Sequence, residues 1–340
     1  MINHKKRIDY LTAEYSNVPV LQFVKAVNDC YYRRCAGNYD ATPDIAYDAV
    51  HAWKRISDFL SLRLPDIANY SIVDIGSGTG FVAQRVTSNI LPVSQYVGYE
   101  PSDDMLKIAR RKHNVPRISF YPLDIEHKVS ETITGITGPK IVTINSVLHH
   151  IVLWEAFLAD VIDILNAGDL FIICHEPNSR FWENPQLVQA FDAIVAEKQT
   201  KTRQLAIYLN PLNYIRKLQR LLGIVKSQSL VDVINEELKE RQILQKNLLP
   251  DMIGAIIDYS VPLCWRNIKC DKEFDEGYFN IERLKNEYFK ECEIIHSFTY
   301  QHLAFSLSIV TDKWKQIDRI MSKKYPDDGA QFCMIVRKKD

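Results

Sequence analysis

The chain has 340 residues, of which 46% are hydrophobic and 25% charged, ordinary values for a globular protein that can hold one large domain with an insertion or two domains. Its 42 basic and 42 acidic residues give a formal net charge of +0, so the chain lacks the concentrated positive charge that nucleic-acid binding usually needs. The seven cysteines are scattered without a C-x-x-C pair, and no apolar run has the length of a membrane span. We therefore expect no metal site, no signal peptide and a reduced, cytoplasmic setting.

Residues 1–66 show helical periodicity and no strand-like alternation. Apolar residues recur three and four positions apart, as Trp53, Ile56 and Leu60 do on one helical face. Pro65 ends this segment. We expect a helical prefix that covers part of a ligand cleft.

A glycine-dense turn follows the first strand-like run. The apolar run before it leads into Gly76-Ser77-Gly78-Thr79-Gly80, and an amphipathic run begins at Phe81. Strand, tight turn and helix in this order bring backbone N–H groups close to a ligand. Phe81 stands where the dinucleotide fingerprint G-x-G-x-x-G needs a glycine, and the Gly-Lys-Ser/Thr of a phosphate-binding P-loop is absent. The turn indicates a ligand site and excludes those two classes.

From residue 71 onward, short apolar runs alternate with helical ones, which is typical of βαβ units and a parallel sheet. We expect strands at 71–75, 96–100, 117–121, 140–146 and 170–174, with helices between them at 81–90, 102–112 and 152–166. Ligands of such sheets bind beyond the carboxyl ends of the strands. The residues directly after each strand are therefore the candidates for a site.

Helical periodicity returns over residues 178–256, which we expect to form a cap inserted between sheet strands. Leu187, Phe191 and Ile194 share one face, Asn210-Pro211 opens a second helix, and Ser229 caps a third. The sheet then resumes, with a helix at 281–289, a strand near 293–299, a helix at 311–322 and a final strand at 331–337. The predicted units are the prefix 1–66, a core of 67–177 and 257–340, and the cap 178–256.

Four motifs of the core resemble, in the same order, those of the class I S-adenosylmethionine (SAM) methyltransferases. They are Asp74 with Gly76, Gly78 and Gly80; Tyr99-Glu100-Pro101-Ser102-x-x-Met105-Leu106; Asp124-Ile125; and Asn145-Ser146-Val147-Leu148-His149-His150. The family often begins its fourth strand with Asp, whereas this run starts with Lys140, at the end of the strand far from the site. The resemblance implies an α/β fold with a seven-stranded Rossmann-like sheet, whose last strand is antiparallel, carrying the prefix and the inserted cap.

The resemblance also implies a SAM cofactor and the residues that hold it. Glu100 would accept the two ribose hydroxyls, and Asp124 would accept from the adenine amine while Ile125 packs on the ring. An aspartate at a strand end is also a common turn residue, and an aromatic residue of the prefix is also a common core residue. The cofactor-binding candidates are Asp74, Gly76, Ser77, Gly78, Gly80, Glu100, Pro101, Met105, Asp124, Ile125, Asn145, Ser146 and, from the prefix, Tyr39.

Polar residues beyond the fourth and fifth strands are the candidates for catalysis: His149, His150, His175 and Glu176. A neutral imidazole could accept a proton from an attacking nucleophile near pH 7, and Glu176 could hold a cationic amine or act as a base. Each of the four could instead be structural, with the histidines orienting their loop through hydrogen bonds.

These features predict a SAM-dependent methyltransferase that moves a methyl group to an oxygen or nitrogen nucleophile of a small molecule, a natural product or metabolite, by in-line displacement. The expected partner is this small-molecule acceptor, with neither nucleic acid nor a membrane; a homodimer is left open. Methylation of a peptide, protein or tRNA, and a SAM-binding regulator without turnover, are the alternatives.

Overall fold

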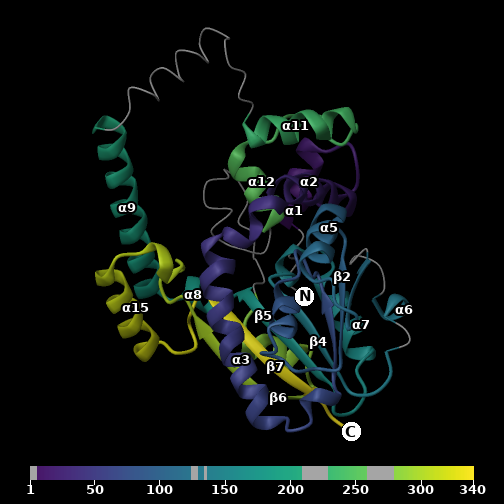
Figure 1. Ribbon diagram of the computed structural model, residues 1–340. Coiled ribbons are helices and arrows are strands. Elements are labelled where there is room, and N and C mark those ends of the chain that lie inside the picture. The colour runs from purple at the N-terminus through teal and green to yellow at the C-terminus, as the bar shows by residue number, and fades with distance from the viewer. Residues whose placement is uncertain (1–5, 124–128, 134–135, 209–228, 259–278) are drawn as a thin grey trace.

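Seven strands form one sheet at the centre of the molecule (Figure 1). The computed structural model describes residues 6–123, 129–133, 136–208, 229–258 and 279–340. The strands are β1 (Ser71–Ile75), β2 (Gln95–Glu100), β3 (Ile118–Pro122), β4 (Lys140–Asn145), β5 (Leu170–Pro177), β6 (Cys292–Tyr300) and β7 (Gln331–Lys338). Their order is β3-β2-β1-β4-β5-β7-β6, and β7 runs antiparallel to both of its neighbours. The predicted seven-stranded α/β sheet with an antiparallel last strand is confirmed.

Helices cover both faces of this sheet. On one face α3, α4 and α5 bury Trp53, Val86 and Leu106, and on the other α7 and α14 bury Phe157 and Leu284. Because both faces are covered, β1 and β5 are buried at every position. The described helices are α1 (Lys6–Tyr15), α2 (Val20–Cys35), η1 (Ala36–Ala41), η2 (Asp44–Ala49), α3 (Val50–Arg63), η3 (Ile67–Asn69), α4 (Phe81–Thr87), α5 (Asp103–Lys112), α6 (Val129–Thr132), η4 (Leu148–His150), α7 (Trp154–Asp163), α8 (Ser179–Glu183), α9 (Pro185–Tyr208), α11 (Leu230–Glu240), α12 (Pro250–Ile257), α14 (Ile281–Glu287), η5 (Leu307–Ile309) and α15 (Asp312–Lys324).

The central strand β1 lies where the direction of the chain through the sheet reverses. It pairs in parallel with β2 on one side and with β4 on the other. The loops after two neighbouring strands run in opposite directions at such a point, which leaves a crevice between the loops at the carboxyl ends of the strands. The turn that follows β1 lies at this crevice.

Helices α1 and α2 of the prefix and part of the inserted segment form one helical unit beside the carboxyl ends of the strands (Figure 1). Phe23 of α2, Ile234 of α11 and Ile256 of α12 belong to one cluster of buried side chains. A backbone bridge between Ser16 and Leu244 joins the same two parts of the chain. Two segments that the sequence suggested as separate units therefore share a single hydrophobic core.

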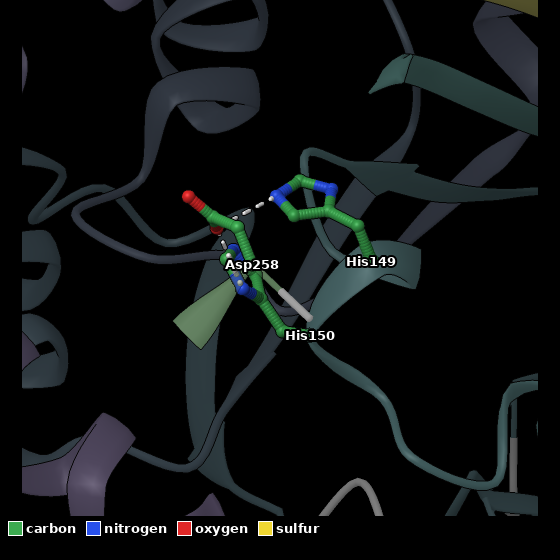
Figure 2. A group of neighbouring side chains, drawn as sticks. All are labelled: His149, His150 and Asp258. Carbon is green, nitrogen blue, oxygen red and sulfur yellow. Dashed lines mark ion pairs between the residues drawn. The ribbon is translucent and has the colours of Figure 1, made fainter. Parts of the chain in front are cut away.

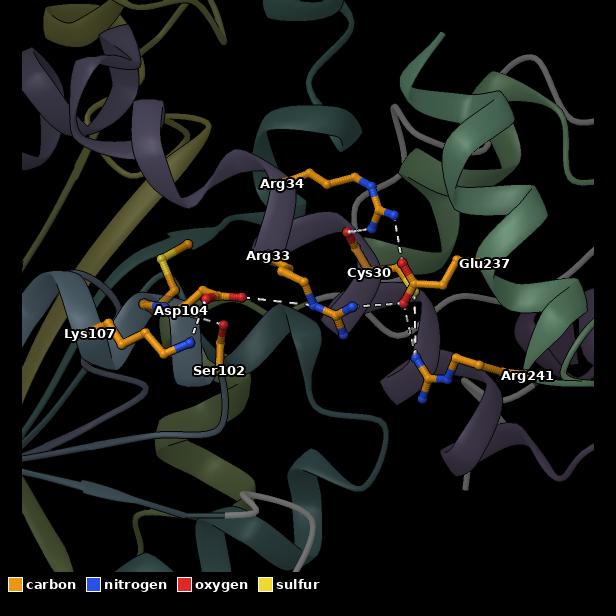
Figure 3. A network of polar contacts seen from close by, with 9 residues as sticks. Cys30, Arg33, Arg34, Ser102, Asp104, Lys107, Glu237 and Arg241 are labelled. Carbon is orange, nitrogen blue, oxygen red and sulfur yellow. Dashed lines mark hydrogen bonds and ion pairs between the residues drawn. The ribbon is translucent and has the colours of Figure 1, made fainter. Parts of the chain in front are cut away.

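Charged side chains link this helical unit internally and to the sheet domain (Figure 3). Glu237 of α11 accepts from Arg33 and Arg34 of α2 at 2.9 and 2.6 Å. Arg33 also lies 3.8 Å from the carboxylate of Asp104 on α5. Partial burial alone would raise the pKa of Glu237, but Cys30 and the two guanidinium groups lower it to about 2. The ionised carboxylate thus connects α11 to α2.

Helix α9 lies apart from this unit, beside α15 (Figure 1). Its Ile194 packs with Leu303 and Trp314. The residues expected to form one cap over 178–256 are therefore divided between two places, and the helix predicted at Asn210-Pro211 lies outside the described residues. Within the described ranges, no helix is both long and apolar enough to cross a membrane.

Two helix starts agree with the sequence, whereas the end of β5 does not. Ser229 opens α11 with a capping box, in which its hydroxyl accepts from the Asp232 backbone and the Asp232 carboxylate accepts from Ser229. Ser102 caps α5 by accepting from Met105 N. Strand β5, however, continues to Pro177, through a bulge at which His175 has a φ of 60°. His175 and Glu176 are thus part of the strand and do not follow it as predicted.

Candidate functional site

The glycine-rich turn is fixed against the end of β2 by backbone hydrogen bonds. Gly76 N and Ser77 N both donate to Tyr99 O, at 2.8 and 2.9 Å. Gly78 N donates to Glu100 Oε2 at 2.9 Å. The turn and the acidic side chain at the end of β2 therefore form one rigid edge of the crevice.

Three glycines of the turn have positive φ, and each meets a different surrounding. Gly76, Gly78 and Gly80 have φ of 72°, 54° and 85°. A Cβ on Gly76 would lie 2.5 Å from a methyl carbon of Val147, and one on Gly80 would lie 2.6 Å from the ring of His113. A Cβ on Gly78 would meet no atom within 4 Å, because Gly78 faces a cavity. Gly76 and Gly80 allow close packing, whereas Gly78 leaves room for a ligand.

That cavity brings together eight of the cofactor-binding candidates. Tyr39, Gly76, Gly78, Glu100, Pro101, Met105, Asn145 and Ser146 line it. Further lining residues, which the sequence did not single out for this purpose, come from α2 and from the loop after β4: Val24, Lys25, Asn28, Asp29, Tyr32, Val147, His150 and Ile151. The polar pair Asn28-Asp29 interrupts the apolar pattern of α2 and was the one sequence feature that could have indicated that this helix lines the cavity.

The buried carboxyl of Glu100 has the properties of a ribose acceptor. Only 7% of Glu100 is exposed, and burial raises its pKa to about 7 despite the hydrogen bonds from Ser102 N and Gly78 N. Those two bonds, both of 2.9 Å, use one lone pair on each carboxylate oxygen. Two acceptor positions remain, which matches the two hydroxyls of a ribose. The open space beside Gly78 and this carboxylate fit the nucleoside of SAM.

Three other candidates lie near the cavity without lining it. Asp74 is 1% exposed and accepts from Tyr96 Oη at 2.5 Å and from Thr143 Oγ1 at 2.7 Å. Burial raises the pKa of Asp74 to about 6. Asp74 thus connects β1, β2 and β4 beneath the turn. Ser77 and Gly80 are also absent from the lining residues, whereas Asp124 and Ile125 lie outside the described residues.

Side chains of the prefix hold it over the turn. Asp40 of η1 accepts from Thr79 Oγ1 at 2.5 Å, between two glycines of the turn. Trp53 Nε1 of α3 donates to Asn145 Oδ1 at 2.7 Å. Since Tyr39 precedes Asp40, these contacts position its ring at the cavity.

A second cavity of about 680 Å³ adjoins the first, because Tyr32, Tyr39, Ser146 and His150 line both. This volume lies in the range of small-molecule sites. Apolar side chains of α11 and α12 form one wall, tyrosines of the prefix form another, and polar groups from the ends of β4, β5 and α12 complete it. Its lining includes Tyr31, Tyr32, Ile234, Ile253, His149, His150, His175 and Asp258.

A buried carboxylate orients His149. Glu176 is 0% exposed, and its Oε1 accepts from Val147 N and Leu148 N at 2.7 and 2.8 Å, while Oε2 lies 2.7 Å from His149 Nδ1. Burial would raise the pKa of Glu176, but His149 and the backbone donors lower it; burial would lower the pKa of His149, but Glu176 raises it. Nδ1 of His149 therefore carries a proton, because a carboxylate can only accept. Glu176 itself does not line the cavity and organises the loop.

The other two histidines have different surroundings. His150 Nδ1 lies 2.8 Å from Ile257 O, and its Nε2 lies 2.9 Å from Tyr32 Oη, so Nδ1 donates and Nε2 accepts. Burial and the neighbouring His149 lower the pKa of His150 to about 4. His175 Nδ1 lies 2.6 Å from Tyr300 Oη, and burial lowers its pKa to about 4 as well. Both rings are therefore neutral near pH 7.

An acidic side chain that the sequence did not indicate completes this group. Asp258 Oδ1 lies 3.6 Å from His149 Nε2 and 3.5 Å from His150 Nδ1 (Figure 2). It directly follows α12, more than a hundred positions from the two histidines, and no local motif marks it. Only the packing of α12 against α2 brings it to the site.

Comparisons with known proteins agree with this fold. A family model described as a methyltransferase domain matches residues 67–253, more than half of the chain. A malonyl-[acyl-carrier protein] O-methyltransferase of Bacillus cereus is 27% identical over 95 residues, which are 28% of this chain and 34% of that protein. The chain thus spans about a third of the length of the curated relatives it matches.

Solved structures with low sequence identity also align with the chain. A SAM-dependent methyltransferase from Anabaena variabilis has 14% identity and a TM-score of 0.48, over 96% of this chain and 98% of the other. One from Mesorhizobium loti has 12% identity and a TM-score of 0.41, over 88% and 99%.

Proposed function

Because this chain belongs to the methyltransferase domain family and is a SAM-dependent methyltransferase, we propose that it methylates an oxygen or nitrogen nucleophile of a small molecule by in-line displacement. SAM is its cofactor and supplies a methyl group that is already activated as a sulfonium. What the chain must provide is the position of the acceptor and the removal of its proton.

The observation that supports this proposal is the junction of the two cavities. Tyr32, Tyr39, Ser146 and His150 border both, so a molecule in the second cavity meets the first across these four side chains. An acceptor atom must lie about 3 Å from the methyl carbon and opposite its bond to sulfur. A shared border between two cavities suits this requirement, and the prefix and α11–α12 would exclude water during the transfer.

The polar floor of the second cavity supports an acceptor that loses a proton. Burial lowers the pKa of His149, but Glu176 raises it above its ordinary value, and the Asp258 carboxylate lies beside the ring. A hydroxyl or ammonium group placed there would pass its proton to this floor. Glu176 stabilises the orientation of His149 and is not itself the base that the sequence left open.

The walls of the second cavity support a small acceptor over a macromolecule. Tyr31, Ile234 and Ile253 belong to three different helices around the opening, and the formal net charge of +0 offers no general attraction for nucleic acid. We also propose a cytoplasmic location, since the described cysteines are all free thiols.

Calorimetry followed by product detection tests the proposal. SAM and its demethylated product should each bind the full chain, and methyl-labelled SAM should label a low-molecular-weight compound in a metabolite extract. Label in a protein or tRNA fraction would favour the macromolecular alternative, and binding without any labelled product would favour a regulator. Absence of binding by both cofactor forms would contradict the assignment of the first cavity.

A further inference from the structure

Three ligand atoms meet at the floor of the second cavity in the spacing of a metal site. His149 Nε2 and His150 Nδ1 lie 3.6 and 3.5 Å from Asp258 Oδ1, and one ligand atom from each residue lies within 4.8 Å of the others (Figure 2). In a tetrahedral zinc site with ligands at about 2.0–2.2 Å, neighbouring ligand atoms are roughly 3.3–3.5 Å apart. The two separations to Asp258 match this spacing, and the two imidazole nitrogens lie within 4.8 Å of each other.

The groups behind the two imidazoles are those that metal-binding histidines use. Glu176 Oε2 lies 2.7 Å from Nδ1 of His149, so the ring presents Nε2 to Asp258. Tyr32 Oη lies 2.9 Å from Nε2 of His150. Imidazoles that bind metals almost always donate their second N–H to a carboxylate, a carbonyl or a water, which fixes the ring and makes the ligating nitrogen more basic. The hydroxyl of Tyr32 can take the same part for His150.

The proton on His150 has a place to go when an ion binds. Without an ion, Nδ1–H of His150 donates to Ile257 O at 2.8 Å. Binding through Nδ1 requires the other tautomer, in which Nε2–H donates to Tyr32 Oη. Both tautomers keep the hydrogen bond between His150 and Tyr32, with Tyr32 Oη as donor in one and acceptor in the other, while Ile257 O no longer receives the His150 proton once the ion binds.

We propose that His149, His150 and Asp258 bind one divalent transition-metal ion, with zinc as the natural fit to two imidazoles and a carboxylate. Three protein ligands leave a fourth position for water or an acceptor group, as in catalytic zinc sites. An acceptor oxygen at that position would lose its proton more readily, and with the ion bound His149 would be a ligand and not the proton acceptor. This departs from the expectation of no metal site, which rested on the spacing of the cysteines. The role of the ion in the reaction rests on the proposed function, whereas the binding of the ion to these three residues does not.

Cobalt titration of the full chain tests the site without any turnover. After treatment with a chelator, the wild-type chain should bind one Co²⁺ with visible absorption bands typical of a nitrogen- and oxygen-ligated ion, and Zn²⁺ should displace it. Asp258→Asn and His150→Gln should each weaken binding at least tenfold. Asp44→Asn and Cys35→Ser change side chains of the same cavity outside the cluster, so both should bind Co²⁺ like wild type.

Binding of the demethylated cofactor, measured in parallel, separates the two proposals. Asp258 does not line the first cavity, so Asp258→Asn should keep this affinity and show that the chain is folded. Failure of the wild-type chain to bind Co²⁺ or Zn²⁺, or equal binding by both cluster variants, would overturn the metal site and leave the methyltransferase proposal intact. Loss of cofactor binding by wild type would contradict the proposed function, whatever the cobalt result.

Discussion

Glu100→Gln should change how the stability and cofactor affinity of the chain depend on pH. Burial raises the pKa of Glu100 from 4.5 to about 7, so the folded state favours the protonated carboxyl. Its contribution to the free energy of unfolding is therefore fully present below pH 4.5 and is lost as the pH rises through 7. Between pH 5 and pH 8 the loss amounts to about 2.5 kcal/mol in wild type and should be absent in Glu100→Gln. Denaturant unfolding at several pH values measures this difference.

The same carboxyl predicts proton release when the cofactor binds. Ribose hydroxyls donate to the ionised form, so affinity for the demethylated cofactor should rise about 100-fold from pH 5 to pH 8, with close to one proton released at pH 6. Calorimetry in buffers of different ionisation enthalpy counts that proton. Asp103→Asn, an exposed change in the first turn of α5, is the control. Equal pH slopes for wild type and Glu100→Gln would refute the assignment of a raised pKa to this residue.

Three further substitutions test single contacts. Gly78→Ala and its control Gly138→Ala each place a Cβ in open space, at φ of 54° and 82°, so their backbone strain should be similar, about 1–2 kcal/mol. Calorimetry should show that only Gly78→Ala lowers cofactor affinity, by about tenfold or more. Equal affinities of the two variants would argue against the cavity as the cofactor site. Glu176→Gln should lower the free energy of unfolding by at least about 2 kcal/mol, because the backbone N–H groups of Val147 and Leu148 lose a charged acceptor. The exposed substitution Glu293→Gln is its control. Unchanged denaturation curves for Glu176→Gln would contradict the role of Glu176 in holding the loop after β4. Glu237→Gln should speed amide hydrogen exchange in α11 at pH 7, whereas the exposed control Glu240→Gln should not. The difference in exchange rate between Glu237→Gln and wild type should vanish as the pH falls from 4.5 toward 2, because the wild-type carboxylate is protonated there. A difference that persists at pH 2 would contradict the ion pairs.

Local chemistry allowed the sheet and its cofactor edge to be predicted from sequence. Positive φ at Gly76 and Gly78 is a constraint within a single turn. Glu100 ends the next strand along the chain and contacts that turn, so its position also remains visible in the sequence. The alternation of apolar runs and helical periods placed the seven strands, with errors mainly at their ends. Strand β5 was predicted too short because the bulge at His175 depends on pairing with β7, which the local pattern does not encode.

The acceptor side was decided by tertiary structure. The sequence did not distinguish the roles of the four catalytic candidates. The structure does, because Glu176 contacts His149 and the loop after β4, and because Tyr32 and Ile257 form hydrogen bonds with the two ring nitrogens of His150. Asp258 had no sequence signal, since a carboxylate after a helix is common and its partners lie more than a hundred residues away. The sequence determined the cofactor by itself, because the turn after β1 and the end of β2 carry recognisable local motifs, although α2 completes the cavity around them. The acceptor cavity needed the packing of α2, α11 and α12, whose contacts join distant parts of the chain.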